Sequence, residues 1–233
     1  MYPEASGVRE MKAGVELPKY PELERLELVY PGPQALLGVP IHWTEKRDGS
    51  QLRIALVEGE LLISTRHQDE ASKKFQEYFK STKQAQGVEE LLRETNGGAT
   101  PPAAVFNEEL VVFGELLVKG KSPARFELHE EHEFVLFDLW SQHQGQFLNY
   151  TAAYQQAYHF GLPFVECWSL TKLLTLEDLF KERDTMLALA KERGREGVVL
   201  KAFRDNKALY AKEKVDIPRI ERVQLDDGRV FLP

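Results

Sequence analysis

Apolar and polar positions alternate with a period of two along several stretches of the chain, which is the pattern of half-buried β-strands. The clearest example is a hairpin, in which residues 52–58 and 61–65 form two strands separated by Gly59 and Glu60. Six further segments are predicted as strands, namely residues 23–30, 103–118, 132–140, 162–168, 196–203 and 208–215.

Helices are predicted for residues 71–84, 87–95, 151–161 and 176–194. In the last of these, apolar side chains recur at helical spacing and Gly194 follows the final turn, as expected of an amphipathic helix. Turn-rich connections are predicted at residues 31–40 and 96–102, and an irregular arm at residues 1–20. Mostly antiparallel strands with helices inserted between hairpins predict an α+β fold, in a single domain over residues 1–233.

The composition allows one sizeable core, because 42% of the 233 residues are hydrophobic. A single cysteine, Cys167, cannot form an internal disulfide, so a reducing, cytoplasmic location is expected. No apolar run approaches the ~20 residues of a membrane span, and the N-terminus lacks the apolar core of a signal peptide. The formal net charge of −7 weakly opposes a protein that coats nucleic acid, although a local basic face on an acidic protein is compatible with such a partner.

The first candidate for chemistry is Lys46, in the sequence EKRDG, with Arg53 seven residues later. A lysine between a strand and a glycine turn can present its amine to a phosphate, and neighbouring cations or a metal favour the reactive neutral amine. An ordinary solvated turn has the same sequence, so this motif alone decides nothing. At the end of the hairpin, Arg66 could bind a phosphate or a ribose through its guanidinium. The alternative is that it is an ordinary surface arginine.

Two acidic residues lie in the apolar strands. The carboxylate of Glu115 is costly there unless it is paired or bound to a metal, and Gly114 lets a ligand approach the backbone closely. Asp138 follows Phe137, and alternation predicts that these two side chains point to opposite faces. Phe137 would then offer its ring to a purine and Asp138 would support a metal or position the lysine, the alternative being a core phenylalanine and a strand-end aspartate.

The last two strands carry Glu196, Lys201, Lys212 and Lys214. Lys212 and Lys214 share one face of an alternating strand. Two like charges side by side repel each other, so this pair is expected to face an anion such as an α-phosphate. The alternative is a pair of solvent-facing lysines on an edge strand.

Together and in this order, the motifs between Thr44 and Lys214 resemble those of the covalent nucleotidyltransferase superfamily, which contains ATP-dependent RNA ligases, DNA ligases and mRNA capping enzymes. The resemblance implies the ATP-grasp-like nucleotidyltransferase domain of ligases and capping enzymes, with ATP and Mg²⁺ (or Mn²⁺) as cofactors. It implies that Lys46 becomes adenylylated while Lys212 and Lys214 contact the α-phosphate. The residues expected to bind the nucleotide are Glu45, Asp48, Arg53, Arg66, Glu115, Phe137 and Lys201, and those expected to hold the metal are Glu196, Asp138 and Glu115.

The implied function is the joining of nucleic-acid ends, of RNA more than of DNA. AMP would pass from the lysine to a 5′-phosphate, and a 3′-hydroxyl would then displace it and seal the strand. The spacing of Arg53 from Lys46 is similar to that in some RNA ligases, although Gln51 stands where they have asparagine. The 19 residues after Lys214 are too few for the OB-fold that follows in DNA ligases and capping enzymes, so no OB-fold domain is expected.

Four alternatives stay open at this point. They are a minimal ATP-dependent DNA ligase, a capping enzyme that uses GTP, an enzyme that adenylylates another kind of acceptor, and a nucleotide-binding module without catalysis. The last is disfavoured, because a degenerate copy has little physical reason to keep charges that repel one another. The oligomeric state is not indicated by the sequence.

Overall fold

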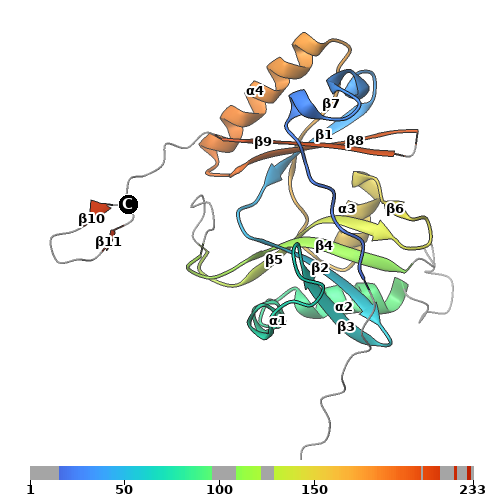
Figure 1. The fold of residues 1–233 in the computed structure, drawn as a ribbon, viewed down its shortest axis with the longest axis vertical. Coiled ribbons are helices and arrows are strands. Elements are labelled where there is room, and N and C mark those ends of the chain that lie inside the picture. Colours follow the sequence, from blue (N-terminus) through green and yellow to red (C-terminus); the bar gives the residue numbers. More distant parts are fainter. Residues whose placement is uncertain are drawn as a thin grey trace, which may run out of the picture.

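The computed structural model describes residues 16–95, 109–121, 129–205, 207–215, 223–224 and 230–231. Within these residues the chain forms two large antiparallel sheets, one above the other, with helices on their outer faces (Figure 1). This arrangement confirms the α+β class predicted from the strand and helix pattern. Among the described residues, no helix is both long and apolar enough to cross a membrane.

The upper sheet has the strand order β7-β1-β8-β9. Its strands are β1 (Pro40–Lys46), β7 (Cys167–Lys172), β8 (Gly197–Arg204) and β9 (Lys207–Lys214). The long helix α4 (Leu176–Glu192) packs on the outer face, where Leu179 and Met186 meet Val198 and Leu200 of β8. The side chain of Thr175 caps this helix by accepting a hydrogen bond from Asp178 N.

The lower sheet has the order β3-β2-β4-β5-β6, and its outer face carries the largest apolar core of the molecule. The strands are β2 (Ser50–Val57), β3 (Glu60–Thr65), β4 (Leu110–Leu117), β5 (Glu133–Ser141) and β6 (Gln146–Phe147). Its helices are α1 (Lys73–Lys80), α2 (Ala85–Arg93) and α3 (Tyr150–His159). Two short strands, β10 (Val223–Gln224) and β11 (Val230–Phe231), pair separately from both sheets.

Two predicted strands are wrong in the structure. Residues 23–30 contain the 3₁₀ helix η1 (Leu26–Leu28), followed by η2 (Pro33–Leu36). The apolar residues of the first segment do not share one face, because Leu26 is fully buried whereas Leu28 is 65% exposed.

The predicted strand at residues 162–168 is mostly a crossing between the sheets. Backbone bonds tie it to Leu136 of the lower sheet, and it reaches the upper sheet at Glu166, whose carbonyl oxygen accepts from Glu45 N, before β7 begins at Cys167. The hairpin, the four helices and the two last strands agree with the sequence prediction to within a few residues.

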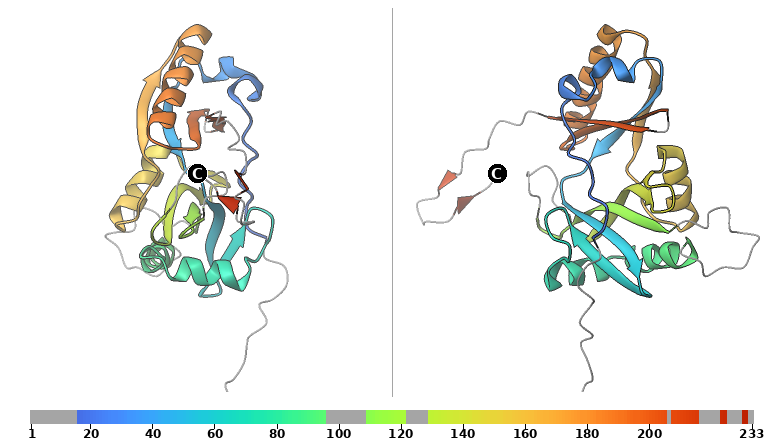
Figure 2. Two further views of the ribbon diagram at one scale, coloured as in Figure 1. Left: turned by 90° about the vertical axis from the view of Figure 1, so that its left-hand side faces the viewer. Right: turned by 45° about the vertical axis from the view of Figure 1, so that its right-hand side comes forward.

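The arm predicted at residues 1–20 lies outside the described residues as far as residue 15, and so do residues 96–108 and most of the tail after Val215. The described part, from residue 16, has no regular secondary structure, as expected. It is nevertheless packed, because Leu17 and Tyr20 belong to a third apolar cluster that fills the space between the two sheets. Both views of Figure 2 show this segment, in blue, passing from the lower layer to the upper one.

Gly197 is required where β8 meets both of its neighbours. It lies opposite Lys46 of β1 and opposite Lys214 of β9. A Cβ atom at this position would lie 2.0 Å from the carbonyl oxygen of Glu213, so a side chain would push β9 away. Glycine therefore allows the close approach that brings the ends of these three strands together.

Gly197→Ala is expected to lower the free energy of unfolding by about 2 kcal/mol, because the packed strands must shift to admit the methyl group. Urea denaturation measures the loss. Gly59→Ala is the control, since its Cβ would meet open space and only its left-handed backbone, with φ of +84°, opposes the change, at a cost of about 1 kcal/mol. A smaller loss for Gly197→Ala than for Gly59→Ala would contradict the steric argument.

Candidate active site

A pocket lies between the two sheets and encloses about 770 Å³ of empty volume, open solvent included. Its walls come from residues 20–23, which precede η1, and from the end of β1. Strands β2, β4 and β5 contribute from below, and β8 and β9 from above. The lining residues that were predicted from the sequence are Glu45, Lys46, Arg66, Glu115, Phe137, Lys201, Lys212 and Lys214.

Lys46 is the last residue of β1, and its amine enters the pocket from the upper sheet. Its Nζ donates a hydrogen bond to Glu196 Oε2. The other carboxylate oxygen of Glu196, Oε1, forms an ion pair with Lys214 Nζ at 2.5 Å. One carboxylate thus bridges two lysines, and the strand pairing brings these lysines close to it, because both lie opposite Gly197, the residue after Glu196.

Lys212 and Lys214 both line the pocket, which confirms that they share the inner face of β9. Burial, followed by the charges of Lys214 and Arg66, lowers the pKa of Lys212. Arg66 stands at the rim, where its Nη2 lies 3.3 Å from Glu22 Oε1. These cations and Lys46 lie near one another in the pocket wall, in a protein whose net charge is negative.

Glu115 faces these cations from β4 below. Its Oε1 accepts a hydrogen bond from Gly49 N at 3.1 Å. Burial raises the pKa of Glu115 to about 7; the charges of Glu196 and Asp48 act in the same direction, whereas Lys46 opposes them. Near neutral pH the site therefore holds a carboxyl group whose ionised form is only marginally stable, and a cation would stabilise that form.

The raised pKa of Glu115 predicts a pH-dependent effect of Glu115→Gln on stability. Between pH 4.5 and about 7 the folded chain holds a proton that the unfolded chain has released, so the contribution of Glu115 to stability falls as the pH rises through this window. Glu115→Gln avoids that loss, because an amide does not ionise, and its oxygen can still accept from Gly49 N. The variant is expected to be more stable than the unaltered chain at pH 8, with the difference shrinking towards pH 4.

Urea denaturation in metal-free buffer across this pH range is the measurement. Glu60→Gln, at an exposed position of β3, is the matched control and should not show the trend. Parallel stability profiles for Glu115→Gln and the unaltered chain would count against a buried, proton-binding Glu115.

A β-bulge overturns the prediction that Phe137 and Asp138 point to opposite faces. The β4–β5 register passes from the pair Phe113–Asp138 to the pair Gly114–Leu136, so Phe137 is the extra residue. Both side chains consequently point towards the inter-sheet space, where both contact Tyr20. Sequence alternation assumes a regular pleat, and a bulge breaks that assumption.

Asp138 is separated from the other two residues that were expected to hold a metal. It is fully buried and forms an ion pair with Lys201, whose Nζ lies 2.9 Å from Oδ2. Burial raises the pKa of Asp138 and lowers that of Lys201, and each charge opposes the shift of its partner. Of the three residues expected to hold a metal, Glu115 lines the pocket whereas Asp138 and Glu196 do not, and no cluster of three metal-ligating side chains occurs among the described residues.

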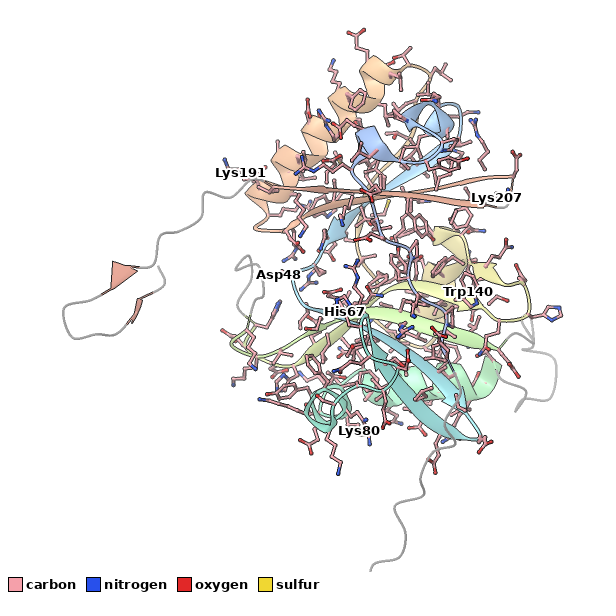
Figure 3. The ribbon with its side chains drawn as sticks, in the orientation of Figure 1. Asp48, His67, Lys80, Trp140, Lys191 and Lys207 are labelled. Carbon is pink, nitrogen blue, oxygen red and sulfur yellow. The ribbon has the colours of Figure 1, made fainter. Side chains whose placement is uncertain are left out.

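The other three residues that were expected to bind the nucleotide lie in different parts of the structure. Arg53 does not reach the pocket wall; it is 1% exposed and its guanidinium donates to the carbonyl oxygens of Leu17 and Thr65 at 2.9 and 2.8 Å. Asp48 is buried in the connection between the sheets (Figure 3), near enough for its charge to act on Glu115. Glu45 lines the pocket and lies 3.6 Å from the guanidinium of Arg47.

Tyr20 and Gln51 also line the pocket, although neither was predicted from the sequence as a site residue. Tyr20 lies in the segment expected to be an irregular arm, and only the apolar spacing of Leu17, Tyr20 and Leu23 hinted that this segment is packed. Gln51 lies opposite Glu115 across the β2–β4 pairing. Its amide nitrogen is buried without a hydrogen-bond partner among the described residues, which makes it a donor available to a ligand.

Comparison with known proteins finds the family and the fold. Comparison with curated protein sequences gives no match. Among solved structures, an archaeal ATP-dependent RNA ligase is 21% identical, with a TM-score of 0.64, and the match covers 85% of this chain and 48% of that one. A mutant RNA ligase of Naegleria gruberi with AMP and Mn is 18% identical, with a TM-score of 0.62, covering 84% of this chain and 56% of that one.

A putative ATP-dependent DNA ligase from Aquifex aeolicus is 20% identical, with a TM-score of 0.55, covering 83% of this chain and 49% of that one. The chain thus spans about half the length of these solved chains. The family model for RNA ligase matches residues 39–215, which contain every predicted site residue. The chain therefore belongs to the RNA ligase family.

Proposed function

We propose that this chain is an ATP-dependent RNA ligase and that Lys46 is its nucleophile. In the first step the Lys46 amine, after losing a proton, attacks the α-phosphorus of ATP, so that an N–P bond forms and pyrophosphate leaves. AMP then passes from the lysine to a 5′-phosphate and forms a 5′–5′ pyrophosphate. A 3′-hydroxyl attacks that phosphate, AMP leaves and the strand is sealed.

The main support for this proposal is the set of side chains that share the pocket with Lys46. Its amine shares a pocket with Lys212, Lys214 and Arg66, which suit the phosphates of a nucleotide. The same pocket offers the ring of Phe137 and the apolar side chains of Val165 and Val199, which suit a purine. A nucleotide therefore has both of its parts accommodated within reach of one lysine.

Mg²⁺, or Mn²⁺, is proposed as the second cofactor, and Glu115 and Glu196 are the residues that would hold it. They fit, because a neighbouring cation would stabilise the ionised form of Glu115, whose pKa is raised by burial. Mg²⁺ is also typically bound by one or two carboxylates together with phosphate oxygens. When bound, the metal would neutralise charge on the triphosphate. Solved relatives in N. gruberi carry ATP or AMP with Mn, which agrees with this choice.

RNA is the proposed nucleic acid, in preference to DNA, because the matched family is that of RNA ligases. The single nucleotidyltransferase domain over residues 1–233 and the reducing, cytoplasmic location stay predictions from the sequence. The roles given above to individual site residues are likewise part of the proposal.

Incubation with ATP labelled at the α-phosphate, in the presence of Mg²⁺, tests the first step. Label that stays on the denatured protein is the expected result, and its absence would sink the proposal. A chase with 5′-phosphorylated RNA or DNA tests which nucleic acid accepts the AMP, and RNA is expected to remove the label faster. Removal only by nicked DNA would favour a DNA ligase instead, and labelling by GTP in preference to ATP would favour a capping-type enzyme.

A further inference from the structure

A strap, formed by residues 17–26, connects the two sheets across the pocket (Figure 2). At its lower end, the buried guanidinium of Arg53 donates to the carbonyl oxygens of Leu17 and Pro18. At its upper end, Glu24 O accepts from Lys212 N at 2.9 Å, and Leu26 N donates to Glu213 at 2.8 Å. The strap is therefore fastened to both layers rather than lying on one of them.

Tyr20, in the middle of the strap, reaches into the space between the sheets. Its hydroxyl donates to Asp138 Oδ2 at 2.5 Å. The same oxygen accepts from Lys201 Nζ at 2.9 Å, and Lys201 also donates to the carbonyl oxygen of Phe137. The edge of the Tyr20 ring meets the Phe137 ring, with centroids 5.0 Å apart at 74°. One side chain thus contacts both the ion pair and the aromatic ring beside it.

Tyr20, Phe137 and Lys201 all line the pocket, together with Val165 and Val199. Lys201 lies against the Phe137 ring and Asp138, whereas Lys46, Lys214 and Arg66 lie close enough to Lys212 for their charges to lower its pKa, so the lining cations form two groups. Val199, which lies opposite Lys212 in the β8–β9 pairing, belongs to the wall between these groups. Flat aromatic and aliphatic walls with a few polar groups suit a nucleobase, whereas clustered cations suit a triphosphate. A residue that fixes Phe137 and Lys201 would therefore affect the binding of the base and not the binding of the phosphates.

We infer that Tyr20 is a positioning residue for the nucleobase, which acts by holding Asp138 and Phe137 and thereby fixing Lys201. This rests on the proposed function, because it takes a nucleotide as the ligand of the pocket. Asp138 is fully buried, so every hydrogen bond that it loses leaves a charged group less well satisfied. Without the tyrosine hydroxyl, the Asp138–Lys201 pair would have to rearrange, and the wall that receives the base would lose its fixed geometry.

Tyr20→Phe is the discriminating variant, because it keeps the ring against Phe137 and removes only the hydroxyl. Its affinity for α,β-methylene-ATP, a non-transferring analogue, is expected to fall about tenfold, the loss typical of one hydrogen bond to a charged group. Its affinity for inorganic tripolyphosphate, which has no base, is expected to be unchanged. Titration calorimetry measures both ligands, and the matched control is Tyr158→Phe, which removes a hydroxyl from a 74% exposed tyrosine of α3.

Two outcomes would overturn the inference. Unchanged affinity of Tyr20→Phe for the ATP analogue would show that the hydroxyl does not fix the base site. An equal loss for the analogue and for tripolyphosphate would show a general structural effect instead.

The kinetics of lysine labelling provide a second readout, in which Tyr20→Phe should raise the KM for ATP and leave the rate at saturating ATP near that of the unaltered chain. Labelling also separates the two proposals. If the unaltered chain binds the analogue but is never labelled by ATP, the catalytic proposal fails while the binding comparison still decides the role of Tyr20. If the unaltered chain does not bind the analogue at all, both fail.

Discussion

Lys46→Ala is expected to abolish covalent AMP labelling, with a loss of at least about a thousandfold, because the N–P bond of the intermediate forms on the amine that this change removes. The fold should survive this change. Lys46 stands at the end of a strand and its side chain is 22% exposed, and Glu196 keeps its second partner, Lys214. The measurement is the initial rate of label incorporation from ATP, alongside thermal unfolding of the same samples.

Lys80→Ala is the matched control for this prediction. Lys80 ends α1, and its side chain points away from the molecule in Figure 3. This variant should label like the unaltered chain. Labelling that persists in folded Lys46→Ala would mean that another lysine, with Lys212 and Lys214 the nearest candidates in the pocket, carries the AMP.

Glu196→Ala is expected to lower the rate of adenylylation by about a hundredfold or more, a loss typical of removing one charged group that organises a catalytic site. The carboxylate contacts two lysines in the structure, because it accepts a hydrogen bond from Lys46 and forms an ion pair with Lys214. Without it, two cations face each other with no shared anion, and the proposed metal loses one of its two carboxylates. The rate should also respond more weakly to added Mg²⁺.

Glu192→Ala, at the exposed end of α4, controls for the loss of a nearby negative charge. Rates of labelling over a series of Mg²⁺ concentrations compare the two variants. Equal rates for Glu196→Ala and Glu192→Ala would remove Glu196 from the site.

The position of the strap shows why sequence alone does not complete the site. The bond between Tyr20 and Asp138 joins residues 118 positions apart, and the pair of Lys201 with Asp138 joins residues 63 apart. Periodicity reports only neighbours along one element, so it carries no information on such contacts. Arg53 shows the same limit, because its spacing from Lys46 gave no sign that the guanidinium would bind backbone carbonyls of the strap.

Hydrophobic periodicity and turn residues were enough to predict the strand hairpin, the helices and the α+β class, and the order of the site motifs can be read along the chain. Strand alternation also placed Lys212 and Lys214 on one face, because a regular strand fixes the direction of every second side chain. Three features became visible only in the folded chain: Phe137 and Asp138 share a face, Asp138 pairs with Lys201, and residues 17–26 bridge the sheets. A bulge, a buried ion pair and a strap each depend on which distant segments pack together, and that depends on the packing of the whole core.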